Sequence, residues 1–303
     1  MASAAAPPLR IMPLGDSITM GIGSATTSSY RVDLQNRLRR AGLDVDFVGS
    51  QHDGAPAGAD LDHEGLSGWS IAQIAARADG WLATYRPDVV LLQAGTNDMR
   101  TPSGAVGVTA RLSALIDQIR ADVPAAEIFV AKITGTRSTF AAAQQKRTDA
   151  YNATVPGVVG GKGPHVHLVD QSTVKGIDIR DGLHPNDFGY AKMSWNWYQA
   201  MAGIFGAGTA WPKDNNPYAS TRGYFCHLVD GDPGPQWKAF FDCRWYYRTL
   251  VATVVRGHSA KVWTWQTKRR VTERRRVRVK GHYETRSVTV SKWVPFDPNR
   301  LTL

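Results

Sequence analysis

The first 210 residues alternate short strand-like runs with longer amphipathic segments, and this alternation restricts the possible folds more than any other feature. Each strand-like run precedes a segment whose apolar residues recur at helical spacing. The runs lie at 9–14, 45–48, 89–93, 128–133 and 165–169, and the helical segments at 30–41, 71–85, 106–120, 139–154 and 187–205. A strand–helix unit repeated five times predicts an α/β fold, with a five-stranded parallel sheet covered by helices on both faces.

The composition changes abruptly near residue 210. Residues 211–303 contain 18 Lys and Arg against 7 Asp and Glu, whereas residues 1–210 contain 18 and 19. Beyond the step, apolar residues recur with a period of two, which is typical of strands. We therefore predict an α/β domain at 9–210, a linker at 211–217 and a small basic, Trp-rich, all-β domain at 218–303. Residues 1–8, rich in Ala and Pro, are expected to be a disordered start.

Residues that can take part in catalysis follow four of the predicted strands. Ser17 follows the first strand, Gly68 the second, Asn97 the third, and Asp181 and His184 the fifth. In a parallel α/β sheet, the loops at the carboxyl ends of the strands collect the active site. We therefore expect these segments to meet at one edge of the sheet.

These residue types are the ones that acyl transfer requires. A serine hydroxyl needs a neighbouring base, and the base needs a group that orients it. Ser17 can serve as nucleophile and His184 as base, while Asp181, three residues earlier, can reach the imidazole Nδ1. These three form the predicted catalytic triad.

A tetrahedral intermediate also needs hydrogen-bond donors aimed at its oxyanion. The backbone N–H groups of Ser17 and Gly68 and the side-chain amide of Asn97 can supply three. Gly65 competes with Gly68 for this role. Glycine is expected at position 68 because a side chain would block the close approach of the backbone.

The residues around these positions resemble those of the SGNH hydrolases, also called the GDSL esterase/lipase superfamily. The resemblance covers about residues 9–206 and rests on four segments in the family's order: Gly15-Asp16-Ser17, Gly65-Leu66-Ser67-Gly68-Trp69, Gly95-Thr96-Asn97-Asp98 and Asp181-Gly182-Leu183-His184. The G-x-S-x-G elbow of the α/β-hydrolases is missing. The resemblance implies a flavodoxin-like three-layer α/β/α sandwich and a serine esterase without cofactor or metal.

Longer stretches around the same residues are similar to bacterial carbohydrate esterases of family three. They include His63-Glu64-Gly65-Leu66-Ser67-Gly68-Trp69 and Asp181-Gly182-Leu183-His184-Pro185-Asn186-Asp187. This resemblance implies a secreted enzyme that removes acetyl groups from plant polysaccharide, although the chain shows no signal peptide. The alternatives are a broad-specificity lipase or arylesterase and, in another class, a polysaccharide- or cell-surface-binding module with a spent esterase site.

The C-terminal part offers fewer signals. Cys226 and Cys243 are the only cysteines, and because they form no CxxC motif they do not predict a zinc site. A secreted protein would join them in a disulfide, whereas a cytosolic one would keep two thiols. Trp263 and Trp265 share one face of a predicted strand, where they could stack on sugar rings or form a small core. The basic charge favours contact with an anionic polymer or cell surface over nucleic acid.

Two further classes of function are disfavoured. No apolar run approaches the roughly 20 residues that a membrane-spanning helix needs. Acidic residues and a histidine gather at 60–64, but their spacing fits no EF-hand, so we expect a solvated loop and no metal.

Overall fold

The computed structural model describes residues 7–56, 58–136, 138–206 and 211–218, together with five strands of the remaining chain. The chain divides into two compact units, Met1–Tyr218 and Ala219–Leu303. One six-stranded sheet lies in the first unit, and the second unit contains a three-stranded and a two-stranded sheet.

The sheet of the first unit is parallel throughout, in the order β2-β1-β4-β5-β6, with β3 paired to β1. Its strands are β1 (Leu9–Asp16), β2 (Val45–Phe47), β3 (Glu64–Leu66), β4 (Val89–Gln93), β5 (Glu127–Lys132) and β6 (Val166–Asp170). Without β3 this is the flavodoxin-like order 2-1-3-4-5. The predicted α/β fold is confirmed, and each of the five predicted strands is present.

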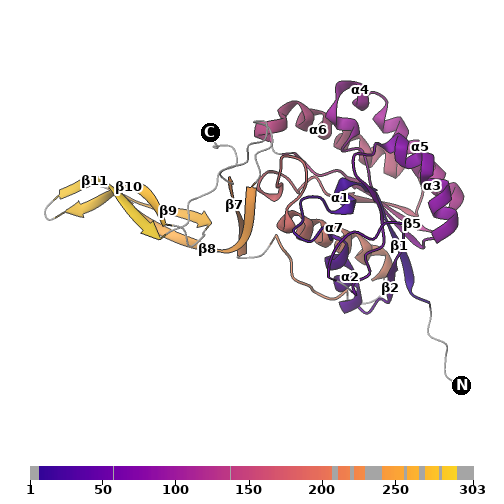
Figure 1. Ribbon diagram of the computed structural model, residues 1–303, viewed down its shortest axis with the longest axis horizontal. Helices are drawn as coiled ribbons and strands as arrows, with labels where there is room; N and C mark the ends of the chain where they lie inside the picture. Colours follow the sequence, from indigo (N-terminus) through magenta and orange to yellow (C-terminus); the bar gives the residue numbers. More distant parts are fainter. Residues whose placement is uncertain are drawn as a thin grey trace, which may run out of the picture. The chain divides into compact units, whose positions relative to one another are not determined.

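Helices cover both faces of this sheet (Figure 1). They are α1 (Ser17–Met20), α2 (Arg31–Arg40), α3 (Ile71–Tyr85), α4 (Pro102–Ala105), α5 (Val108–Asp122), α6 (Ser138–Gly160) and α7 (Asp187–Phe205), with 3-10 turns at Asp98–Arg100 and Gly176–Asp178. Strand residues alternate between the two faces, so Met12 packs with α3, α5 and α6, whereas Ile11 packs with α2 and α7. The two cores leave the carboxyl edge of the sheet to the loops.

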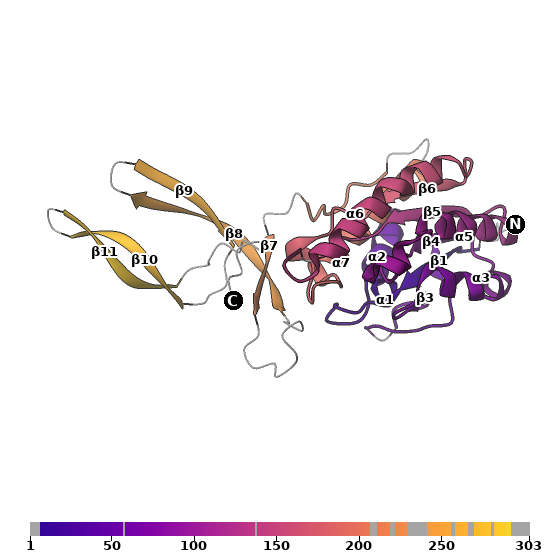
Figure 2. The ribbon, with the colours of Figure 1, turned by 90° about the horizontal axis from the view of Figure 1, so that it is seen from above.

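The strand β3 was not predicted, and it shapes the site. β1 pairs with β2 through Leu9–Ile11 and then with β3 through Leu14–Asp16, so both short strands line the same edge of β1. The strand β3 is seen beside β1 in Figure 2. Three residues, Glu-Gly-Leu, show no alternation that would reveal a strand. The pairing sets Gly65 beside Gly15 and thereby brings the 65–69 segment to the end of β1.

The predicted linker packs on the first unit. The rings of Trp211 and Tyr198 lie 5.0 Å apart, and the Tyr198 hydroxyl donates to the carbonyl of Pro212 over 2.8 Å. The Asp214 carboxylate pairs with Arg40 at 2.6 Å and with Arg37 at 3.3 Å. The segment 211–218 therefore lies on α2 and α7, because its apolar and acidic side chains find partners there.

The strands described in the second unit are antiparallel. They are β7 (Arg222–Leu228), β8 (Phe241–Val255), β9 (His258–Trp265), β10 (Arg270–Val279) and β11 (His282–Ser291). The register sets Cys226 opposite Cys243, a position whose Cα spacing suits a disulfide. Trp263 and Trp265 lie two apart on β9 and so share a face. The disulfide and the sugar-stacking role of the two Trp residues stay predictions.

Among the helices that the structure describes, none is long and apolar enough to cross a membrane.

Candidate active site

The end of β1 presents Ser17 at the carboxyl edge of the sheet. Asp16 caps the short helix α1, since its Oδ1 accepts the N–H of Ile18 at 2.9 Å. Ser17 is the first residue of that helix, so its hydroxyl is not used for capping. A Cβ at Gly15 would lie 2.4 Å from the carbonyl of Gln93, so glycine lets β1 approach β4 at this point.

The structure brings Ser17, His184 and Asp181 together in one relay. Ser17 Oγ lies 2.9 Å from His184 Nε2, and His184 Nδ1 lies 2.8 Å from Asp181 Oδ2. The other oxygen of Asp181 accepts the backbone N–H groups of Leu183 at 3.1 Å and His184 at 2.9 Å. The carboxylate thus holds both the ring and the backbone of the histidine.

The Asp181 carboxyl is kept in its charged form. Burial by itself raises its pKa, but the hydrogen bond and charge of the His184 ring, together with the N–H groups of His184 and Leu183, outweigh burial and bring the pKa below its ordinary value. An ionised carboxylate only accepts hydrogen bonds, so it favours the tautomer with the proton on Nδ1. Nε2 is then free to accept the Ser17 proton.

The loop that carries His184 is fixed on both sides. The N–H of Arg180 donates to the His184 carbonyl at 2.8 Å, closing a tight turn. The buried carboxylate of Asp178 pairs with Lys192 of α7 at 2.9 Å. A Cβ at Gly23 would lie 2.9 Å from the Cβ of His184, so the loop after α1 packs directly on the histidine. The imidazole is therefore held in place before any substrate arrives.

Asn97 and the 65–69 segment are also joined. The Asn97 Nδ2 donates to the carbonyl of Trp69 at 2.9 Å. The neighbouring Asp98 accepts the N–H of Ile71 at 3.0 Å and pairs with Arg111 at 2.9 Å, which anchors the Asn97 turn to α3 and α5. The predicted oxyanion donors thus lie on connected loops, and their role stays a prediction.

The two candidate glycines differ in what the surrounding protein requires of them, and the expected close approach of Gly68 to an oxyanion stays a prediction. An added Cβ at Gly68 would meet nothing within 4 Å, but the residue has a φ of +81°, a conformation that side chains disfavour. Crowding is found at Gly65 instead, where a Cβ would lie 2.4 Å from the N of Met20. Gly68 is required by its backbone conformation, and Gly65 by the packing of β3 under α1.

This difference predicts separable effects. Gly65→Ala should lower the free energy of unfolding by about 1–3 kcal/mol, because backbone atoms must move to admit the methyl group. Gly68→Ala should cost about 1 kcal/mol in strain but lower kcat about tenfold or more, because its N–H would turn away from the oxyanion. Urea unfolding and ester turnover measure the two effects, and wild-type kcat in Gly68→Ala would remove Gly68 from the oxyanion hole.

Arg31 is a residue of the site region that the sequence analysis missed. Its side chain is fully buried, and among the described residues its guanidinium donates to five backbone carbonyls: Thr19, Met20, Thr27, Asp53 and Leu61. It therefore ties α1 to the loops on either side. Nothing in the pattern indicated this role, since one arginine on a helix normally reads as a solvent-facing residue.

The Asp16 carboxyl lies fully buried next to the nucleophile. Burial raises its pKa from 3.8 to about 6, partly opposed by the N–H of Ile18, the Thr96 hydroxyl and the charge of His184. The folded protein therefore holds this proton more tightly than the unfolded chain does. Stability should fall as the pH rises from about 4 to about 6, by about 3 kcal/mol in all.

Asp16→Asn tests this linkage, because the amide cannot ionise. Relative to wild type, the variant should gain about 2 kcal/mol of unfolding free energy between pH 4 and pH 7. Urea unfolding followed by helical circular dichroism at both pH values measures the change. The exposed Asp44→Asn serves as control, and a wild-type-to-variant difference that does not vary with pH would contradict the prediction.

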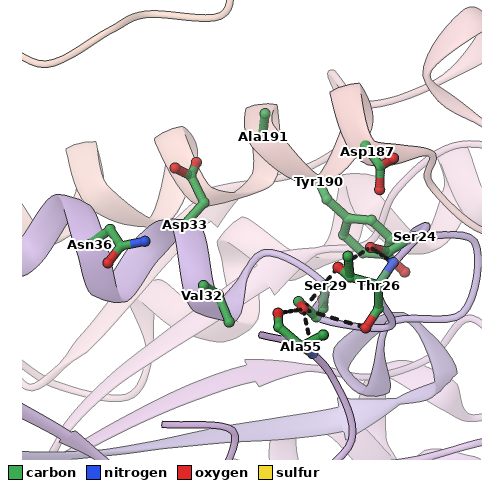
Figure 3. A pocket seen from close by; sticks show the side chains of 11 residues that line it. Ser24, Thr26, Ser29, Val32, Asp33, Asn36, Ala55, Asp187, Tyr190 and Ala191 are labelled. Carbon is green, nitrogen blue, oxygen red and sulfur yellow. Dashed lines mark hydrogen bonds between the residues drawn. The ribbon is translucent and has the colours of Figure 1, made fainter. Parts of the chain in front are cut away.

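A polar pocket of about 240 Å³ lies beside the loop after α1 (Figure 3). The loop residues Ser24 and Thr26 form one wall, while Asn36 of α2 and Tyr190 of α7 contribute to the others. The Tyr190 hydroxyl donates to the carbonyl of Ile22 at 2.6 Å, so the pocket and the relay share the loop that packs on His184. Hydroxyl, amide and carboxylate groups make the lining suitable for a ligand rich in hydroxyls.

The polar cluster at 60–64 is not the solvated loop that was expected, because His63 and Glu64 are fully buried and their side chains accept nearby backbone N–H groups. Asp60 accepts the N–H of Phe47 at 2.6 Å, and Glu64 accepts the N–H of Ser50 at 2.7 Å. The His63 ring accepts the N–H of Gly65 at 2.9 Å. Across the described part of the chain, no group of three acidic, His or Cys side chains is arranged to hold a metal ion.

Comparison with known proteins places the first unit among esterases. The GDSL-like Lipase/Acylhydrolase family matches residues 14–192. The solved structure of a family 3 carbohydrate esterase from Clostridium thermocellum is 38% identical, with a TM-score of 0.59 over 67% of this chain and 100% of that one. A family 3 carbohydrate esterase from Talaromyces cellulolyticus is 28% identical, with a TM-score of 0.57 over 66% of this chain and 100% of that one.

Two curated relatives are longer than the matched region. A multidomain esterase from Ruminococcus flavefaciens is 30% identical over 261 residues, which are 77% of this chain and 32% of that protein. A putative endoglucanase X from Acetivibrio thermocellus is 38% identical over 145 residues, which are 46% of this chain and 60% of that protein. The chain therefore spans only part of each.

Proposed function

Because the chain belongs to the GDSL-like lipase/acylhydrolase family and is a carboxylic ester hydrolase, we propose that it removes short acyl groups, acetyl above all, from carbohydrate through a covalent acyl-enzyme. The observation that carries the mechanism is the relay of 2.9 Å and 2.8 Å from Ser17 through His184 to Asp181. Nucleophile, base and orienting carboxylate stand at hydrogen-bond distance without rearrangement.

The proposed reaction has two steps. Ser17 Oγ attacks the ester carbonyl while His184 Nε2 takes its proton, and the same nitrogen then returns the proton to the departing alcohol. A water molecule then attacks the acyl-Ser17 ester while His184 Nε2 takes its proton. The same nitrogen passes this proton to the departing Ser17 Oγ, so the carboxylic acid is released and the serine hydroxyl is restored. Asp181 stays ionised throughout and stabilises the imidazolium that forms in each step.

The oxyanion of each step needs donors that are in position before the reaction. We assign the backbone N–H groups of Ser17 and Gly68 and the Asn97 amide. The Asn97 Nδ2 carries two hydrogens and spends one on Trp69, which leaves the second for the oxyanion. Three donors of this kind make electrostatic stabilisation a main source of the rate enhancement.

The carbohydrate part of the proposal is supported by the names of the similar solved structures, both family 3 carbohydrate esterases, and by the polar pocket next to the His184 loop. A polymeric substrate lies outside the cell, so we propose that the enzyme is exported. A disulfide between Cys226 and Cys243, which lie opposite each other on β7 and β8, would agree with that location.

A substrate panel tests the proposal. The full chain is assayed at neutral pH with acetyl and octanoyl nitrophenyl esters and with acetylated xylan. We expect acetate release from xylan and faster turnover of the acetyl ester than of the octanoyl ester. Preference for the octanoyl ester with no release from xylan would favour a broad-specificity lipase, and no turnover of any ester would favour a binding module.

The pocket makes a separate prediction about the sugar. Asn36→Ala should lower kcat/KM for an acetylated xylo-oligosaccharide about threefold to tenfold, the effect of losing one neutral hydrogen bond. Turnover of nitrophenyl acetate should stay unchanged, because this small ester cannot reach the pocket. Equal kinetics of wild type and variant on the oligosaccharide would exclude the pocket as a sugar subsite.

A further inference from the structure

The hairpin of β10 and β11 divides its charges unequally between its two faces. The strands pair antiparallel from Arg270 opposite Ser291 to Val279 opposite His282 (Figure 1). Since successive residues of a strand alternate between faces, the register assigns every residue of the hairpin to one face or the other. The assignment needs only the strand bounds and the pairing.

One face carries four arginines and no acidic residue. Its positions on β10 are Arg270, Thr272, Arg274, Arg276 and Arg278, and those opposite them on β11 are Ser291, Thr289, Ser287, Thr285 and Tyr283. We call these ten positions the arginine face. Each arginine stands opposite a hydroxyl-bearing residue, so the face combines a charge of +4 with a row of hydroxyl groups.

The opposite face is balanced. It holds five valines and a histidine, and its charged residues are Glu273 and Arg275 on β10 and Glu284 and Arg286 on β11. Each glutamate stands diagonally across from an arginine of the other strand, at positions whose spacing allows opposite charges to attract. The two arginines of this face are therefore matched by two acidic residues, whereas the four of the arginine face are matched by none.

We propose that the arginine face binds an acidic polysaccharide, a polymer that carries carboxylates among its hydroxyl groups. Alternate residues of a strand lie about 6.8 Å apart, so Arg274, Arg276 and Arg278 form an evenly spaced row for an extended polyanion. The planar guanidinium binds a carboxylate through two parallel hydrogen bonds. Ser, Thr and Tyr opposite the arginines suit the sugar hydroxyls.

Nucleic acid is the other polyanion that such a row could attract. Single strands are bound on aromatic stacking platforms, and the arginine face has one aromatic position, Tyr283, among its ten. The choice of polysaccharide also rests on the proposed function, because a carbohydrate esterase gains from attachment to its polymer. Binding itself does not depend on turnover, so the two proposals can fail separately.

The test uses the full chain and measures binding to polygalacturonate, with its methyl ester as the uncharged form of the same polymer. Arg274→Gln/Arg276→Gln removes two charges from the arginine face. Arg275→Gln/Arg286→Gln removes two charges from the opposite face of the same hairpin and is the matched control. We expect the first pair to weaken binding about tenfold and the control to weaken it less than about twofold.

Further variants and polymers control for misfolding and for binding to another kind of partner. Arg274→Lys/Arg276→Lys should bind within about threefold of wild type, nitrophenyl acetate turnover should be unchanged in all Arg variants, and Ser17→Ala should bind as wild type does. Equal weakening by the two Gln pairs, loss of binding in the Lys pair or equal binding of the methyl ester would overturn the proposal. Tighter binding to single-stranded or double-stranded DNA than to polygalacturonate would overturn it in favour of nucleic acid.

Discussion

Ser17→Ala is expected to lower kcat for nitrophenyl acetate by at least about 10⁴-fold. The variant keeps the oxyanion donors and the substrate contacts, but it has no atom that can form the acyl-enzyme. Residual hydrolysis by a water molecule in place of Oγ should be slow, because Oγ stands 2.9 Å from its base in the folded protein and a water molecule must be ordered there. The measurement is initial-rate kinetics at neutral pH.

The reading of this experiment depends on the fold staying intact. The Ser17 hydroxyl bonds to His184, while the cap of α1 depends on Asp16, so removing the hydroxyl should leave the local structure in place. KM should change little, since attack and not binding is lost. Ser103→Ala, an exposed serine of α4, is the matched control and should match wild type. If Ser17→Ala kept more than about a tenth of the activity, Ser17 would not be the nucleophile.

The sequence predicts most of the first unit because its strongest signals are local. Buried parallel strands such as Val89–Gln93 are continuously apolar, and α3 occupies the predicted range of Ile71–Tyr85. The strand β3 could not be predicted because three residues with a central glycine show no alternation of apolar and polar side chains. It becomes a strand only because β2 ends at Phe47 and leaves the edge of β1 open. Pairing of this kind depends on distant residues.

The candidate site likewise has a part that the sequence predicts and a part that it does not. Residue type and order were enough to select Ser17, His184 and Asp181, since few side chains can act as nucleophile, base and orienting group. The conformational role of Gly68 and the five carbonyl contacts of Arg31 could not be predicted, because they depend on a φ angle and on where separate loops meet. The type and order of residues along the chain therefore identify the catalytic side chains, but not the residues that hold them in place.

Asp181→Asn is expected to lower kcat about 10³- to 10⁴-fold with little loss of stability. The asparagine Oδ1 can still accept the N–H groups of Leu183 and His184, so the turn keeps its hydrogen bonds. Its amide, however, donates where the carboxylate accepted. The His184 ring must then carry its proton on Nε2, where it cannot take the proton of Ser17. Activity is therefore lost because the tautomer of His184 and the charge at position 181 change, while the geometry of the turn is retained.

Asp181→Ala separates these two contributions. Alanine removes the acceptor for the ring and also the acceptor for both backbone N–H groups, so it should lower the free energy of unfolding by about 1–3 kcal/mol beyond the effect of asparagine. Activity should be low in both variants. If Asp181→Asn retained activity within about tenfold of wild type, another group would have to orient His184. If both variants lost stability equally, the backbone hydrogen bonds of Oδ1 would not be what holds the histidine turn.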